Sequence, residues 1–250
     1  VTGLGKDRLF IVPGNHDVEW ARISRGSEGI ADSLQDRESV NAVLADPNDR
    51  QFMLARLHAY LEFVGSYFGD HLLTGTDRTW YVRSFSAGWR RVDLIGLNSA
   101  WLAHGGHQDL GRLAIGEMAT RLALEEAQDA DLKVALLHHP FSWLQEFDQD
   151  DSGTMLADAC DFVLHGHLHK LGLQQIRGPD TRAMFIAAGA CYETRRSSNS
   201  YNLVRLDLSA GKGTVYLRAY VDKRGGFWTW DGMSYRNVPD GIYQFDFNDP

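Results

Sequence analysis

The sequence predicts a layered α/β fold built around a pair of mixed β-sheets. Short apolar runs are separated by helical patterns in the earlier part of the chain, and several apolar runs follow one another directly later on. Three of the apolar runs end in a cluster of polar side chains. Because ligands bind beyond the carboxyl ends of strands in open α/β sheets, one shared site at a sheet edge is expected.

The strands are predicted from short apolar or alternating runs that turn residues interrupt. Leu9–Val12 is too short and too apolar for an amphipathic helix, and Pro13 and Gly14 stop it, so it is interpreted as a buried strand. The same reasoning predicts strands at residues 81–85, 91–97, 134–137, 162–164, 171–176 and 183–188. A hairpin is expected from 201–208 and 214–221, and the Trp-rich tail to Pro250 is interpreted as strand and loop.

The helices are predicted from caps and from apolar periodicity. Asp46 and Pro47 match an N-cap followed by Pro at the first helical position, so a helix is expected from about Pro47 to Phe68. Further helices are expected at residues 112–128 and 152–160. Residues 19–48 are polar with little periodicity and are interpreted as a loop with one short helix, and residues 103–111 as a second loop.

Composition restricts the class of protein. With 250 residues, 44% of them hydrophobic, one domain over residues 1–250 is expected, with a core of 1–208 and a C-terminal extension of 209–250. A formal charge of −8 argues against extended nucleic-acid binding. No apolar stretch in the sequence is long enough to span a membrane. Only Cys160 and Cys191 are present, which fits a reducing, cytoplasmic location. Val1 resembles neither an initiator nor a signal-peptide start, so the chain is expected to be part of a larger polypeptide.

The three polar clusters predict a metal site. They are Gly14-Asn15-His16-Asp17, His138-His139-Pro140 and the five residues 165–169, HGHLH. Imidazole is the commonest neutral metal ligand, and two His separated by one residue can reach the same site where the backbone turns, here at Gly166. Read alone, the first cluster also matches a turn followed by a helix cap. The combination of all three clusters at strand ends favours metal.

These motifs resemble a known family. The three clusters resemble the third, fourth and fifth motifs of the calcineurin-like metallophosphoesterases in their order, their spacing and their placement at strand ends. The matching residues are Gly14 to Asp17, the His-x-Pro of His138 to Pro140, and Gly166-His167-x-His169. The His-His-Pro form further resembles the cyclic-nucleotide phosphodiesterase branch. The resemblance implies a four-layer α-β-β-α sandwich of two mixed sheets with a two-metal centre at the sheet edge.

The resemblance also implies roles for individual residues. Asn15, His138 and His167 would ligate one metal ion, and His169 would ligate the other. His16 would act as general acid for the leaving-group oxygen, or as a positive charge beside the phosphate. Two divalent or trivalent ions, of Mn, Fe or Zn, would hold a bridging hydroxide that attacks phosphorus.

Five further residues are candidates for substrate binding or for support of the ligands. Asp17 is expected to orient the backbone around His16 rather than bind metal. His139 is expected either to pack under the site or to contact substrate, and His165 to lie behind a ligand or simply to be buried. Arg195 and Arg196 match either a phosphate clamp or an ordinary charged loop.

The chain departs from the family pattern in one respect. The family's first two motifs, an Asp-x-His and a Gly-Asp followed by an acid, do not occur before Asn15. The implied ligands that remain are three His and one Asn, which are neutral and would neutralise two cations poorly. The first metal site is therefore incomplete in this chain, and we expect its ligands in upstream sequence rather than a natural loss of the site.

The function that follows is hydrolysis of phosphomonoesters or phosphodiesters. The acidic balance favours a small, nucleotide-like phosphoester over long nucleic acid. One alternative is a degenerate, non-catalytic module used for regulation or protein contact. Another is a DNA-end nuclease, which would require a basic channel that the composition does not indicate.

Overall fold

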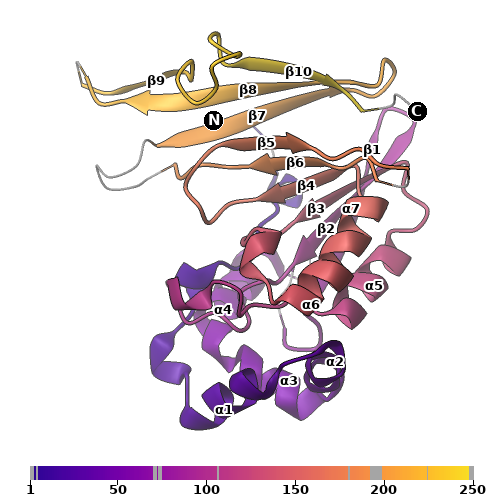
Figure 1. The fold of residues 1–250 in the computed structure, drawn as a ribbon, viewed down its shortest axis with the longest axis vertical. Coiled ribbons are helices and arrows are strands. Elements are labelled where there is room, and N and C mark those ends of the chain that lie inside the picture. The colour runs from indigo at the N-terminus through magenta and orange to yellow at the C-terminus, as the bar shows by residue number, and fades with distance from the viewer. Residues whose placement is uncertain are drawn as a thin grey trace.

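The fold contains two β-sheets and a set of helices. The computed structural model describes residues 3, 5–69, 72, 75–105, 107–179, 181–191, 199–223 and 225–247 (Figure 1). The first sheet has six strands in the order β1-β2-β3-β4-β6-β5, and the second has four, with β8 pairing β7, β9 and β10. The predicted α/β architecture of two sheets is confirmed.

The six-stranded sheet is mixed. Its strands are β1 (Trp80–Ala87), β2 (Arg90–Leu97), β3 (Leu132–Leu136), β4 (Phe162–His165), β5 (Gly172–Gln175) and β6 (Met184–Ala187). Strands β2, β3, β4 and β6 run parallel, while β1 and β5 are antiparallel to their neighbours at the two edges. The carboxyl ends of β3 and β4 therefore lie side by side.

The second sheet is antiparallel in every pair that the described residues form, although it was expected to be mixed. It consists of β7 (Ser200–Asp207), β8 (Lys212–Val221), β9 (Phe227–Trp230) and β10 (Ile242–Asp246). These strands follow one another through short connections, which suit antiparallel pairing, whereas parallel pairing needs a long crossover. The predicted division at residue 208 falls between β7 and β8, which pair with each other, and the single-domain organisation stays a prediction.

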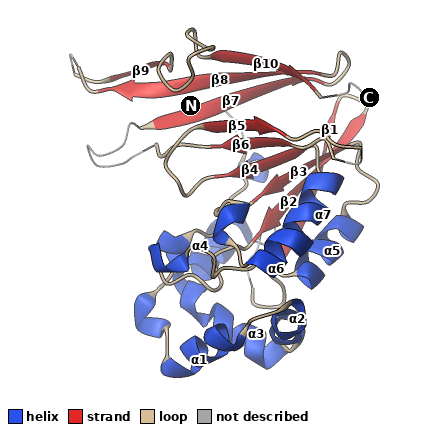
Figure 2. Ribbon diagram, in the orientation of Figure 1, coloured by secondary structure: helices blue, strands red, loops and turns tan. Residues whose placement is uncertain are grey.

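The helices lie around the six-stranded sheet. They are α1 (Arg25–Ser33), α2 (Arg37–Ala45), α3 (Pro47–Leu54), α4 (His58–Phe68), α5 (Glu117–Glu126), α6 (Glu146–Asp148) and α7 (Thr154–Ala159). Figure 2 shows α5 and α7 beside this sheet and α1 to α4 beyond its lower end. A fourth layer was expected, with helices covering the outer face of the second sheet, but none of the described helices lies over that sheet in Figure 2. None of the described helices combines the length and apolar character that a membrane span needs.

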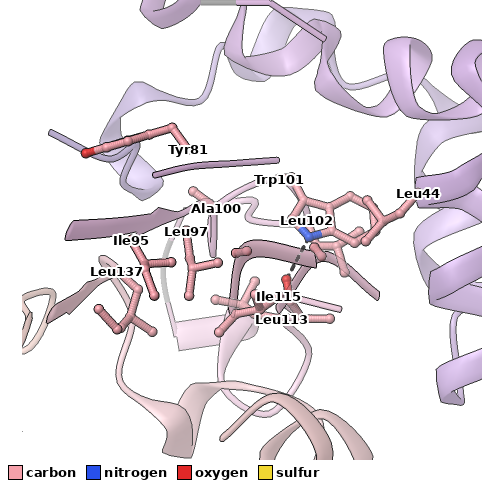
Figure 3. Packing of buried hydrophobic residues seen from close by; sticks show 14 of the residues in the cluster. Leu44, Tyr81, Ile95, Leu97, Ala100, Trp101, Leu102, Leu113, Ile115 and Leu137 are labelled. Carbon is pink, nitrogen blue, oxygen red and sulfur yellow. Dashed lines mark hydrogen bonds between the residues drawn. The ribbon is translucent and has the colours of Figure 1, made fainter. Parts of the chain in front are cut away.

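Two apolar cores cover the two faces of the six-stranded sheet. Val92 and Phe162 pack against Val215 and Leu217 of the second sheet. On the other face, Trp101 lies in the helix-side core, and its indole Nε1 donates to the Ala114 carbonyl over 2.7 Å (Figure 3). That hydrogen bond satisfies a polar atom that would otherwise be buried without a partner. The sheet between the two cores is a rigid base for the residues at its edge.

The predicted strands after residue 80 are confirmed to within a few residues, but the strand at Leu9–Val12 is wrong. This segment forms no β-ladder in the described chain. Ile11 and Val12 are half-buried against the helix-side core, and the Ile11 carbonyl accepts a hydrogen bond from the Tyr81 hydroxyl over 3.0 Å. The apolar pattern indicated burial correctly, but pairing also needs a neighbouring strand, which the described residues do not supply.

The helix predictions are partly confirmed. Asp46 caps α3 as expected, with Pro47 in its first turn, but a 3-10 turn at Ala55–Leu57 separates α3 from α4. Residues 19–48, predicted as a loop with one short helix, contain the two helices α1 and α2, each started by a side-chain cap. The helix expected at 112–128 begins later, at Glu117, because Gly116 has a φ of 97°, which a helix cannot use.

Candidate metal centre

The three polar clusters meet at the carboxyl ends of β3 and β4. His138 follows β3 directly, and residues 166–169 follow β4. The main chain of the two strand ends is joined where Gly166 N donates to the His138 carbonyl over 3.0 Å. Asn15 is brought to the same place by a 3-10 turn, Asn15–Asp17. The convergence expected from sequence is therefore present for Asn15, His138 and His167.

The side-chain oxygen of Asn15 faces two imidazoles at once. Its Oδ1 lies 2.9 Å from His138 Nε2 and 3.2 Å from His167 Nδ1. Asn15 is only 7% exposed, so this contact is shielded from water. Two ligands of a tetrahedral metal with bonds near 2.0–2.1 Å are about 3.3 Å apart, so both separations are close to those of neighbouring ligands on one ion.

Gly14 allows the His138 ring to lie against the main chain. A Cβ at this position would stand 2.8 Å from both Cε1 and Nδ1 of His138, far inside normal contact. The Asp17 carboxylate accepts a hydrogen bond from Gly14 N over 2.8 Å and is exposed. The contact that the structure gives Asp17 is thus with the backbone of this turn, and its role beside His16 stays a prediction.

The sharp turn of the third cluster lies one residue later than predicted. His167 and His169 have φ values of 65° and 52°, whereas Gly166 does not have a positive φ. Left-handed backbone is uncommon for residues other than glycine and costs free energy that the surrounding structure must supply. The strain falls on both histidines that the family resemblance identifies as ligands.

His139 is fully buried beneath the other two imidazoles. Its main-chain N donates to Ser99 Oγ over 3.0 Å, and its ring Nδ1 lies 3.0 Å from the same oxygen. Trp143 is stacked near His139 and is edge-on to His167, with ring centroids 3.9 Å apart in the second case. Sequence reasoning did not identify Ser99 or Trp143, although Ser99 stands just after β2, another strand end on the same side of the sheet.

Burial keeps these imidazoles uncharged. Burial, and then the positive charge that a protonated His167 would carry, lowers the pKa of His138 to about 3. Burial and the neighbouring His138 lower the pKa of His139 to about 2, and burial also lowers the pKa of His165. Neutral imidazoles keep a lone pair available at physiological pH, which is the form that binds metal ions.

The remaining candidate residues are less closely tied to the centre. His16 is exposed and His169 half-buried, and both are near enough to His138 to contribute to lowering its pKa. His165 ends β4, and its Nδ1 lies 3.4 Å from the Gly166 carbonyl. The predicted phosphate-binding residues Arg195 and Arg196 lie outside the described residues.

The residues present fit one transition-metal ion. One nitrogen from each of His138, His139 and His167 lies within 4.8 Å of the others, and the Asn15 amide oxygen touches two of these rings. Neutral nitrogen donors with one oxygen suit Zn²⁺ and similar ions. This histidine group contains no carboxylate, so it does not match the donor set of two closely spaced cations.

A cavity of about 430 Å³ lies beside the centre. Its lining includes Pro140 from the second cluster and His165 and Leu168 from the third, with Lys170 next to His169 in the chain. Leu173 and Phe185 form part of an apolar wall. The cavity is of the size of small-molecule sites in proteins.

Comparisons with known proteins place the chain in a sequence family. The profile of the family described as calcineurin-like phosphoesterase matches residues 2–171, which include all three clusters. No curated protein matches the chain.

Several solved structures are similar to part of the chain. A hypothetical protein from Thermus thermophilus is 14% identical, over 60% of this chain and 62% of that one, with a TM-score of 0.32. Wild-type Vps29 complexed with Zn²⁺ from Entamoeba histolytica is 14% identical over 67% of this chain and 61% of that one, with a TM-score of 0.27. Vps29 from Chaetomium thermophilum is 10% identical over 68% of this chain and 60% of that one, with a TM-score of 0.28. The chain spans about three-fifths of the length of these structures.

Proposed function

We propose a metal-dependent phosphoester hydrolase, because the chain belongs to the calcineurin-like phosphoesterase family. The observation that carries the proposal is the position of Asn15 Oδ1, within 2.9 and 3.2 Å of nitrogens of His138 and His167. Three side chains from distant parts of the sequence converge there, and burial holds His138 neutral. Such an arrangement suits a metal ion, because one amide oxygen and two imidazole nitrogens lie at the separations that neighbouring ligands of one ion have.

The chain's own residues would divide the work between holding metal and moving a proton. Asn15, His138 and His167 would hold one ion, and His169 would contribute to a second; Mn, Fe and Zn are the candidates. When bound, the metal would polarise the phosphoryl oxygens and activate water for hydrolysis. His16, exposed on the turn that carries Asn15, would donate a proton from an imidazole nitrogen to the leaving-group oxygen.

We further propose a small organic phosphoester as substrate, with a nucleotide-like compound as the leading candidate. The cavity beside the centre has an apolar wall for an organic group, and the Lys170 ammonium in its lining carries the charge that a phosphate requires. The formal net charge of −8 argues against a long nucleic acid. A larger polypeptide that supplies carboxylate ligands for the second ion is part of this proposal.

A second candidate is a non-catalytic module of the same family. The observation that favours it is that, among the described residues, the group placed to hold an ion consists of His138, His139 and His167, with no carboxylate joined to it. A centre that holds one ion without an acidic bridge would bind metal but lack the clamp that catalysis by two metal ions uses.

Hydrolysis of bis(p-nitrophenyl) phosphate and p-nitrophenyl phosphate with added Mn²⁺ or Zn²⁺ tests the two candidates. The matched pair is His167→Ala at the centre and His58→Ala, an exposed histidine on α4. The hydrolase proposal predicts metal-dependent turnover that His167→Ala abolishes and His58→Ala leaves unchanged. Tight metal binding without turnover, in the full natural chain, would support the non-catalytic module instead.

A further inference from the structure

His139 has a nitrogen that nothing in the described structure satisfies. The side chain is 0% exposed, and its Nε2 has no hydrogen-bond partner among the described residues. A polar atom buried in this way costs about 1–3 kcal/mol unless it finds a partner. Burial also excludes bulk water as the partner, so a bound species at this position would remove the cost.

The ring of His139 is held so that Nε2 is the atom left over. Nδ1 lies 3.0 Å from Ser99 Oγ, and the main-chain N of His139 donates to the same oxygen over 3.0 Å. If Nδ1 carries the proton and donates it to Ser99, Nε2 carries a lone pair. Stacking on Trp143 limits rotation of the ring. Ser99 and Trp143 thus hold the direction of the imidazole, as second partners of metal-bound histidines do, and a metal ion at Nε2 would select the tautomer that carries its proton on Nδ1.

The neighbours of His139 are the two imidazoles already assigned to metal. Its ring centroid is 4.7 Å from that of His138 and 4.5 Å from that of His167. One nitrogen from each of the three rings lies within 4.8 Å of the others. Two nitrogens bound to one tetrahedral ion at 2.0–2.1 Å are about 3.3 Å apart, so the widest separation in the group would have to contract by up to about 1.5 Å when the ion binds.

We propose that His139 Nε2 is a direct ligand of the metal ion held by Asn15, His138 and His167. The ion is then bound by three imidazoles and one amide oxygen. This inference rests on the metal site of the proposed function and adds a ligand to it. Because imidazole-rich sites suit Zn²⁺ better than Mg²⁺ or Mn²⁺, it also predicts that the isolated site binds Zn²⁺ most tightly of the three.

The test counts imidazoles around bound metal and removes one of them. Zn²⁺ X-ray absorption on the full, tag-free chain should give three imidazoles per ion. His139→Phe keeps an aromatic ring, somewhat larger than imidazole, to stack on Trp143 but removes the nitrogen. Since loss of an outer-shell partner alone weakens metal binding by 10–100-fold, loss of this ligand should raise the Zn²⁺ dissociation constant at least about 100-fold.

The controls separate this inference from the proposed function. His138→Phe should abolish binding in either case, and His58→Phe on α4 should have no effect. Two imidazoles per ion, together with an unchanged dissociation constant for His139→Phe, would overturn the role of His139 while leaving the metal site in place. If the unsubstituted chain binds no Zn²⁺, the metal site of the proposed function itself fails. If the variant does not fold, a count of two imidazoles per ion on the unsubstituted chain still overturns the role of His139.

Discussion

Replacing Gly14 by Ala should damage the metal centre without touching a ligand. The new Cβ would stand 2.8 Å from Cε1 and Nδ1 of His138, and 3.0 Å from Cγ. Carbon atoms in contact are normally about 3.5–4.0 Å apart, so the His138 ring would have to retreat by about 0.7 Å. The backbone at Gly14, with φ −114° and ψ 178°, is ordinary extended chain that Ala adopts freely. The contact with His138 is therefore the cause of any effect.

The size of the effect follows from the geometry. A retreat of the His138 ring moves Nε2 from its place 2.9 Å from Asn15 Oδ1. Displacements of this kind weaken metal binding by about 10–100-fold, and overpacking costs about 1–3 kcal/mol of unfolding free energy. Calorimetric titration with Zn²⁺ measures the first and urea unfolding of the metal-free protein measures the second.

A matched control distinguishes this mechanism from a general effect of the added methyl group. Gly29 lies within α1, and a Cβ there would have no atom within 4 Å. Gly29→Ala should leave Zn²⁺ affinity unchanged and stabilise the fold slightly, because alanine favours the helix. If Gly14→Ala binds Zn²⁺ as tightly as the unsubstituted protein, the proposed position of His138 at the centre is wrong.

Three further predictions concern catalysis, pH and packing. His16→Ala should lower kcat by about 10²–10⁴-fold with bound metal unchanged, and a loss of metal would mean that His16 is a ligand. Because the pKa values of His138 and His139 are lowered in the folded state, the unfolded chain takes up protons first as the pH falls. The unfolding free energy of the metal-free protein should therefore fall below about pH 6.5, with each histidine contributing up to about 1.4 kcal/mol per pH unit. Urea unfolding midpoints that coincide at pH 7 and pH 5 would contradict this prediction. Gly96→Ala should destabilise the fold by about 1–3 kcal/mol because its Cβ would overlap the Tyr81 ring, which thermal unfolding measures.

The residues at the strand ends were predictable because their chemistry and their position agree. Asn15, His138 and His167 each follow a short apolar run closely, and parallel pairing of β3 with β4 brings the last two together. The sequence could not show that Leu9–Val12 forms no strand, since apolar residues indicate burial whether or not a partner strand is present. Hydrophobicity is a local property of the sequence, whereas strand pairing depends on neighbouring strands.

Two other features depend on contacts between distant residues. Only one short helix was predicted where α1 and α2 both form, because their starts depend on caps at Ser24 and Asp36, whereas their apolar periodicity is weak. The state of His139 depends on Ser99, 40 residues earlier in the chain. A sequence shows that a histidine is present after a strand, but only the fold shows which of its nitrogens is satisfied.

The most direct test of the metal centre is a crystal structure of the chain grown with Zn²⁺, with diffraction recorded on both sides of the zinc absorption edge. We predict one anomalous peak within bonding distance of Asn15 Oδ1 and of ring nitrogens of His138 and His167, which lie around one point in the present structure. A peak elsewhere, or none at this place in crystals that contain the ion, would contradict the assignment of these residues as a metal site.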